Sequence, residues 1–284
     1  MFFLRPYQRF LEIFIYPSIW VGAGIASLSL YVQMALNLPL DWHSPVLILF
    51  TSLVFYNLDR IFDVRIGEIP DNKLKSFFSQ KLVFIIVLLA ALASIVMLIL
   101  APDRVRLVSL GALVPLIYGM PLLKLGKKWY RLKDIPGSKA IIVAVTLTYA
   151  TVALPIAYTE ANFNLARAIL LTIFLLVFIG TNSHLFDLRD LKEDRAAGVL
   201  TLPVVIGVKS TRILFTLLNI LVLIIFAAYW FETGKIFTPI TILGAIALDL
   251  IIIWWLKPTT PRNVYNISID GCLFLPLLLI NFEG

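Results

Sequence analysis

Long apolar runs constrain this chain more than any other feature of its sequence. About 20 consecutive apolar residues in a helix are needed to cross the hydrocarbon core of a bilayer. Stretches of about that length occur near 13–36, 44–62, 82–101, 104–120, 138–158, 166–186, 211–231, 237–256 and 263–281. Only 14% of the residues are charged, compared with roughly a quarter in soluble domains. The sequence therefore predicts an all-α polytopic membrane protein with about nine spans.

The loops between these runs are short. No Gly/Ser-rich linker separates the runs, and no loop is long enough to form a soluble domain of its own. We therefore expect residues 1–284 to form a single membrane-embedded helical bundle. The run at 104–120 is the shortest of the set, so its boundaries are the least well defined.

Lys and Arg are distributed unevenly over the two sides of the predicted bundle. Of the 24 Lys and Arg residues, 20 fall on the N-terminal side or in the loops that share it. The positive-inside rule places that side in the cytoplasm, in a bacterial plasma membrane or an organellar membrane. The net charge of +7 follows from this topology, so we expect no nucleic-acid partner.

Two clusters of aspartates lie at the cytoplasmic ends of the second and sixth predicted helices. The first consists of Asp59 and Asp63, and the second of Asp187, Asp190 and Asp194. On a helix each cluster falls on one face, where like charges at this spacing repel one another. A cation is therefore expected near each cluster, and the matching positions of the two clusters suggest two halves that meet at a shared site.

Two kinds of cation fit such clusters. One is a set of basic side chains that form ion pairs with the acids: Arg60, Arg189, Lys192 and Arg195. The other is Mg²⁺, which takes one or two carboxylates and completes its octahedron with water and substrate phosphate oxygens. The repetition of the cluster favours Mg²⁺ and a diphosphate substrate.

The residues of the second cluster also resemble a known motif. The segment DLRDLKEDRAAGVLTLPVVIG, at 187–207, is similar to the second aspartate-rich motif of the UbiA-type intramembrane prenyltransferases. The segment YGMPLLKLGKKWYRLKDIPGSK, at 118–139, is similar to the Y-x-x-P-L-K segment of that family and the lysine-bearing loop that follows it. The resemblance covers nearly the whole chain and implies the family architecture of nine spans with cytoplasmic motifs.

The resemblance also implies a reaction. In this family, Mg²⁺ ions bind the diphosphate of a polyprenyl donor, the allylic C–O bond breaks, and a lipophilic and usually aromatic acceptor captures the carbocation within the membrane lipid. It implies that the five aspartates bind the metal, and that Lys124, Lys139 and Arg189 bind the diphosphate. Tyr118, in the Y-x-x-P-L-K segment, is the expected substrate-binding residue.

The first cluster departs from the family pattern N-D-x-x-D-x-x-x-D. Asp59 and Asp63 match its last two aspartates, but Phe55 and Tyr56 occupy the positions of Asn and Asp. Asn57 does not replace the missing ligand, because two residues along a helix it points about 160° away from Asp59. We therefore expect fewer metal ligands than in a complete pair of motifs.

Two other functions stay open from the sequence. A membrane terpene cyclase would need the same metal site but no acceptor. A non-catalytic or transport-type relative is also compatible with the incomplete first motif, and Pro155 and Pro276 interrupt corresponding spans as in some transporters. Asp249 and Asp270 lie within the last two spans and match no motif, and we expect them to be structural.

Overall fold

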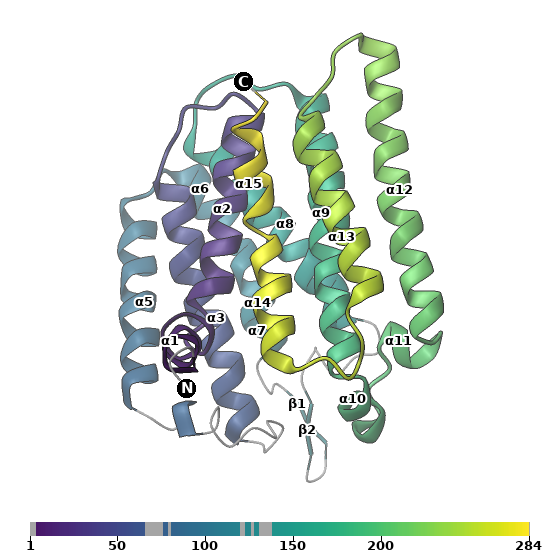
Figure 1. The fold of residues 1–284 in the computed structure, drawn as a ribbon. Helices are drawn as coiled ribbons and strands as arrows, with labels where there is room; N and C mark the ends of the chain where they lie inside the picture. Colours follow the sequence, from purple (N-terminus) through teal and green to yellow (C-terminus); the bar gives the residue numbers. More distant parts are fainter. Residues whose placement is uncertain are drawn as a thin grey trace.

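The computed structural model describes residues 4–65, 76–78, 81–119, 123–125, 128–130 and 138–283. Apart from one two-stranded antiparallel sheet, the regular structure in these residues is helical. The long helices run side by side in one bundle (Figure 1). The predicted all-α class is confirmed, and the small sheet is an addition to it.

The elements follow one another along the chain in a simple order. They are α1 (Leu4–Phe10), the π-helical η1 (Leu11–Ile15), α2 (Ile19–Ala35), α3 (His43–Arg65), α5 (Lys81–Leu100), α6 (Asp103–Ser109), the 3₁₀ turn η2 (Leu110–Ala112), α7 (Leu113–Gly119), β1 (Leu123–Leu125), β2 (Lys128–Tyr130), α8 (Ser138–Tyr158), α9 (Leu165–Arg189), α10 (Leu191–Ala197), α11 (Leu202–Val205), α12 (Val208–Thr233), α13 (Pro239–Trp255), α14 (Arg262–Cys272) and α15 (Leu275–Ile280).

Every predicted apolar run contains helix, but the runs are not all equally good membrane spans. Within the described residues, six helices are long and apolar enough to cross a membrane, with α14 and α15 counted as one. The bent pair of α1–η1 and α2, with an angle of 61° between its parts, makes a seventh. Helix α13, with 17 residues, is shorter. The structure thus shows a multi-pass membrane protein, and the total of nine spans stays a prediction.

The weakest predicted span, 104–120, is divided into α6, η2 and α7. Pro115 has no backbone N–H and cannot continue the helical hydrogen bonding back to Gly111. Gly111 also leaves room for the ring of Tyr149, because a Cβ atom there would lie 2.4 Å from a ring carbon. Pro115 thus accounts for the break in hydrogen bonding, and Gly111 lets Tyr149 of α8 pack closely. All three residues line a cavity described below.

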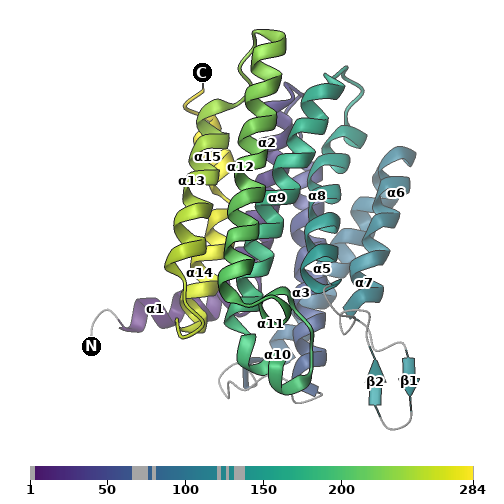
Figure 2. The same ribbon diagram turned by 90° about the vertical axis from the view of Figure 1, so that its right-hand side faces the viewer.

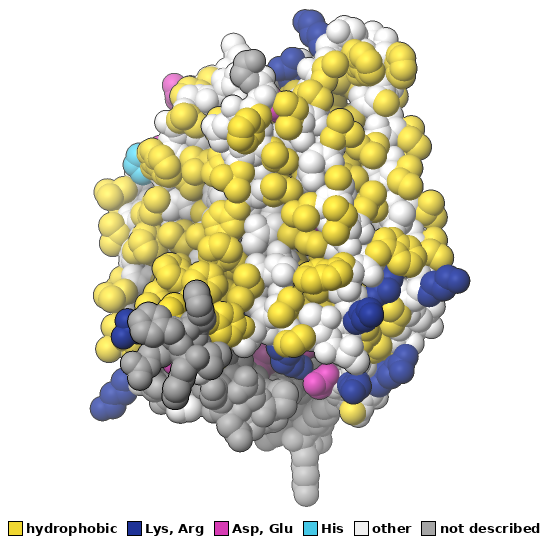
Figure 3. Space-filling model, viewed as in Figure 1, with side chains coloured by type: hydrophobic (Ala, Val, Ile, Leu, Met, Phe, Trp, Pro, Cys, Tyr) yellow, Lys and Arg dark blue, Asp and Glu magenta, His cyan; other side chains and the backbone are white. Residues whose placement is uncertain are grey.

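The outer surface of the bundle suits a lipid environment. Large apolar side chains of α5 and α12 point outward, and Leu100 and Phe231 are about four-fifths exposed (79% and 81%). Figure 3 shows hydrophobic side chains over the middle of the visible face and charged ones gathered toward its two ends. Exposed apolar area on this scale is unfavourable in water but favourable in hydrocarbon.

The two aspartate-bearing helices end at the same end of the bundle. Helices α3 and α9 both run toward the end where α10, α11 and the β1–β2 sheet lie (Figure 1). Helix α1 projects sideways from the bundle near that end, across the direction of the long helices (Figure 2). We call that end of the bundle the motif end. Helix α15 ends at the opposite end of the bundle (Figure 1). Helix α8 packs against both α3 and α9, and α14 packs against α9 and α2.

Candidate functional site at the motif end

Asp59 and Asp63 lie one turn apart near the C-terminal end of α3. This is the i, i+4 arrangement that the sequence predicts. Asp59 lines a cavity enclosed mainly by α3, α6–α7 and α8. Asp63 lies one turn closer to the motif end and is partly buried. The first cluster therefore runs from the cavity toward the end of the bundle.

The cavity beside Asp59 is large and mostly apolar. Its empty space, counted out to its open mouth, is about 1230 Å³. Leu47 and Ile48 from α3 and Leu147 and Leu154 from α8 are among its apolar walls. Among the described residues that line it, Asp59 alone is charged. An elongated hydrocarbon with an anionic, metal-bound head would suit such a cavity.

Phe55 and Tyr56, which replace the expected Asn-Asp pair, also line this cavity. They add aromatic surface next to Asp59 where the family pattern has metal ligands. Asn57 is fully buried and points elsewhere: its Nδ2 donates to the carbonyls of Pro17 (2.9 Å) and Leu53 (2.7 Å). It therefore stabilises the bend before α2 and does not substitute for the missing ligand, as the helix geometry predicts.

The second cluster spans a helix junction. Asp187 belongs to α9 and is 2% exposed, while Asp194 belongs to α10 and is 8% exposed. Asp190 lies between the two helices, at the C-cap position of α9 and the N-cap position of α10. The expectation that all three aspartates share one straight helix is therefore wrong, because α9 ends at Arg189. The chain bends at Asp190, so the three aspartates do not lie along one helix face.

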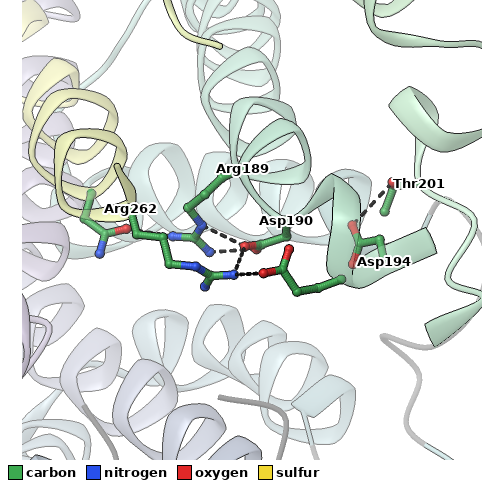
Figure 4. A network of polar contacts seen from close by, with 7 residues as sticks. Arg189, Asp190, Asp194, Thr201 and Arg262 are labelled. Carbon is green, nitrogen blue, oxygen red and sulfur yellow. Dashed lines mark hydrogen bonds and ion pairs between the residues drawn. The ribbon is translucent and has the colours of Figure 1, made fainter. Parts of the chain in front are cut away.

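Two arginines from different helices bind Asp190 (Figure 4). Arg189 donates from Nε to Oδ1 (2.8 Å) and from Nη2 to Oδ2 (2.7 Å). Arg262, at the start of α14, places its Nη2 3.1 Å from Oδ1 of Asp190 and 3.1 Å from Oε1 of Glu193. Arg189 also donates from Nη1 to Oδ1 of Asn266 on α14 (2.7 Å). Asp190 therefore forms ion pairs with basic side chains, which is the first of the two kinds of cation expected from the sequence.

The residues that follow Asp194 in the motif have a local structural role. Helix α10 ends at Gly198 in the left-handed conformation (φ 71°), which a residue with a side chain rarely adopts. Val199 N then donates to the carbonyl of Asp194 (2.9 Å), and the chain reverses. The reversal brings Oγ1 of Thr201 to 3.4 Å from Oδ2 of Asp194 (Figure 4). The Gly and Thr of this segment therefore hold Asp194 in place.

Arg60 links the two clusters electrostatically. It lies on α3 next to Asp59, and it donates to the carbonyls of Ile15 (3.4 Å) and Tyr16 (3.3 Å) in the bend before α2. Its guanidinium interacts electrostatically with both first-cluster aspartates and with Arg189 on α9. Arg60 on α3 and Arg189 on α9 therefore lie within electrostatic range of each other.

Two acids that match no motif are buried in the C-terminal helices. Asp270, on α14, is 8% exposed and interacts electrostatically with Arg60 and Arg189. The sequence analysis expects a structural role for it, and its interaction with two arginines at the motif end is the new observation. Asp249, on α13, is fully buried, and its carboxylate oxygens accept no hydrogen bond from the described residues.

Several other predicted residues lie outside what the structure describes. Tyr118, Lys124 and Lys139 belong to α7, β1 and α8, but their side chains are not among the described ones. Their roles therefore stay predictions. His184, one turn before the second cluster, contacts the carbonyl of Gly180 through Nδ1 (3.0 Å), so its described hydrogen bond is to its own helix.

The described acids do not form a ready-made metal cage. No three His, Cys, Asp or Glu side chains in the described part of the chain lie close enough together to hold a metal ion by themselves. Mg²⁺ seldom needs such a cage, because substrate phosphates and water usually complete its coordination. The donor set, which consists of carboxylates beside an apolar cavity, fits Mg²⁺ that arrives with a diphosphate.

These features define a class: a multi-pass membrane protein with an acidic site at one end of a helical bundle and an apolar cavity leading from it. The chain belongs to the UbiA prenyltransferase family, whose model matches residues 34–267. The resemblance found in the sequence is thereby confirmed. No protein with a curated description matches the chain in sequence.

Solved structures share the fold at low sequence identity. A UbiA homolog from Archaeoglobus fulgidus, bound to GPP and Mg²⁺, has a TM-score of 0.62 and 13% identity, and the match covers 95% of this chain and 97% of that one. A UbiA homolog from Aeropyrum pernix K1, without ligand, has a TM-score of 0.62 and 14% identity over 91% and 98% of the two chains. A digeranylgeranylglyceryl phosphate synthase has a TM-score of 0.58 and 18% identity over 97% and 96%.

Proposed function

We propose that this protein transfers a polyprenyl group from an allylic diphosphate to a lipophilic, aromatic acceptor within the membrane, a reaction of isoprenoid biosynthesis. The observation that carries the proposal is the position of Asp59, where the apolar cavity meets the charged end of α3. A polyprenyl diphosphate has the same two-part chemistry, with a long hydrocarbon chain and an anionic head. Structural neighbours bound to GPP or DMAPP with Mg²⁺ support the same class of donor.

The carboxylates at the motif end are suited to hold Mg²⁺. Asp59 and Asp63 would approach it from α3, and the second-cluster aspartates would approach it from α9 and α10. When bound, Mg²⁺ would supply the positive charge that stabilises the leaving diphosphate. Fixed cations would add to that charge. Lys124 and Lys139 are the proposed diphosphate-binding residues, whereas Arg189, which the resemblance also implies, already binds Asp190 and Asn266.

The cavity walls would position the prenyl chain and keep water away from the reactive carbon. The allylic C–O bond breaks, the electron pair leaves with the diphosphate, and the carbocation remains on the prenyl chain. Aromatic faces stabilise positive charge by about 0.5–2 kcal/mol each. Phe55 and Tyr56, which line the cavity beside Asp59, are placed for this role, and Tyr118 is a further proposed substrate contact.

The acceptor would then attack the carbocation and lose a proton to restore its aromaticity. Membrane lipid surrounds the bundle and supplies both lipophilic substrates. We propose that the motif end faces the cytoplasm, where the water-soluble diphosphate can leave. This orientation agrees with the concentration of Lys and Arg on the loops at that side.

The experiment is to incubate purified protein and Mg²⁺ with polyprenyl diphosphates of several chain lengths, and to measure diphosphate release with and without lipid extract. Release that requires the extract, together with a prenylated product, supports prenyl transfer. Release without the extract, together with a cyclic hydrocarbon, identifies a terpene cyclase instead. No release with any donor contradicts the enzymatic function and favours a non-catalytic relative.

A further inference from the structure

The two arginines on Asp190 differ in how many of their nitrogen atoms are already engaged. Arg189 uses all three: Nε and Nη2 donate to Asp190, and Nη1 donates to Asn266. Arg262 makes both of its described contacts, to Asp190 and Glu193, through Nη2 alone. The described residues provide no partner for its Nε and Nη1. Arg262 therefore has N–H donors left, whereas Arg189 has few.

The arginine with free N–H donors is also the more exposed of the two. The side chain of Arg189 is 18% exposed, and that of Arg262 is 40% exposed. If Arg189 turned toward a phosphate, it would give up contacts of 2.7–2.8 Å to two residues. Arg262 would give up only contacts of 3.1 Å, one of them to Glu193, which is itself half exposed (50%). Reorientation is therefore much less costly for Arg262.

We infer that Arg262 is a diphosphate-binding residue of the site, and that Arg189 is a positioning residue that fixes Asp190 and, through it, Arg262. This inference rests on the proposed function, because it takes the diphosphate as the ligand of the motif end. The planar guanidinium matches two phosphate oxygens at once, and charge-assisted pairs of this kind are among the strongest hydrogen bonds in proteins.

The position of Arg262 would compensate in part for the incomplete first motif. Phe55 and Tyr56 remove ligands from the α3 side. Arg262 begins α14, which packs against α9 and α2, and it reaches the second cluster from outside the motif (Figure 4). It thereby brings a fixed positive charge to the diphosphate from a helix that carries neither aspartate cluster.

The direct test is binding of inorganic diphosphate with Mg²⁺ to detergent-purified protein, measured by isothermal titration calorimetry. Arg262→Ala should bind diphosphate roughly tenfold to a hundredfold more weakly than the natural protein, the range for one hydrogen-bonded charged contact. Arg262→Lys should recover part of the loss, because it keeps the charge but not the planar fork. Arg104→Ala removes a similar pair, Arg104 to Glu160 at 2.9 Å, away from the second cluster, and should leave binding unchanged.

A second variant separates ligand binding from a structural role. Arg262 also links α14 to α10 through Glu193. Glu193→Gln weakens that link but leaves the guanidinium in place, so it should bind diphosphate at least as tightly as the natural protein. If Glu193→Gln and Arg262→Ala weaken binding equally, the link is structural and the inference is overturned.

Failure of the inference can be distinguished from failure of the proposed function. If Arg262→Ala binds diphosphate as tightly as the natural protein, the inference is wrong, whereas prenyl transfer by the natural protein would still establish the function. If the natural protein neither binds diphosphate nor releases it from any donor, both are wrong.

Discussion

Asp190 accepts two hydrogen bonds from its sequence neighbour Arg189, at 2.8 Å and 2.7 Å. This pairing of adjacent residues is possible because α9 ends at Arg189 and the chain bends at Asp190. The arginine is held in turn by Asn266 of α14. The contact therefore fixes the second aspartate cluster relative to the C-terminal helices and sets the direction in which the carboxylate points.

The first prediction concerns this contact. Arg189→Lys keeps a positive charge but lacks the planar fork needed to bind both Asp190 oxygens and Asn266. We expect affinity for inorganic diphosphate to fall by roughly tenfold, the equivalent of one charged hydrogen bond, because Asp190 and Arg262 lose their fixed orientation. Calorimetric titration measures this, with Arg104→Lys as the matched control. Equal affinity in the variant and the natural protein would show that Arg189 does not position the site.

The second prediction concerns the residues that replace the family's Asn-Asp pair. Because the first motif offers only two carboxylates, we expect turnover by the natural protein to require high free Mg²⁺. The double variant Phe55→Asn, Tyr56→Asp adds ligands, and the Mg²⁺ concentration for half-maximal diphosphate release should fall by roughly tenfold, since affinity rises with the number of charged ligands.

The control for this variant is Phe55→Leu, which alters the cavity wall without adding a ligand. It should leave the Mg²⁺ requirement unchanged, even if it changes the preferred chain length of the donor. An identical Mg²⁺ requirement in the double variant and the natural protein would mean that these two positions do not reach the metal.

The third prediction concerns topology. Helix α1 and the end of α15 lie at opposite ends of the bundle (Figure 1), as an odd number of spans requires. Reporter fusions should therefore place the N-terminus in the cytoplasm and the C-terminus on the other side of the membrane. Finding both reporters on one side would reject the count of nine spans.

Much of the fold can be predicted from the sequence, because lipid imposes a simple rule on the chain. A helix that crosses hydrocarbon must be apolar over its length, so the positions of the helices follow from hydropathy alone. Local geometry also accounts for Asn57, whose angular separation from Asp59 on a helix predicts that it points away. The faces of α3 were therefore predictable from residue spacing.

The parts of the site that sequence reasoning missed depend on contacts between distant segments. Arg262 lies 69 residues from its partner Glu193, and nothing in the sequence around it resembles a motif. Helical spacing also placed the three aspartates of the second cluster on one face of a single helix, because residue spacing contains no information about where α9 ends. Asp270 was recognised as a carboxylate within an apolar span, but its interactions with Arg60 and Arg189 could not be read from the sequence.

The most direct test of the central claim is turnover by Asp59→Asn in the presence of Mg²⁺ and a polyprenyl diphosphate. The account predicts that this substitution lowers the rate of diphosphate release by about 10²–10³, the usual cost of losing an electrostatic contact to a leaving group, while the bundle stays folded. Asp103→Asn, whose exposed side chain forms an ion pair with Arg106 on α6, should be nearly silent. Full activity of Asp59→Asn, or release that is indifferent to Mg²⁺, would contradict the account.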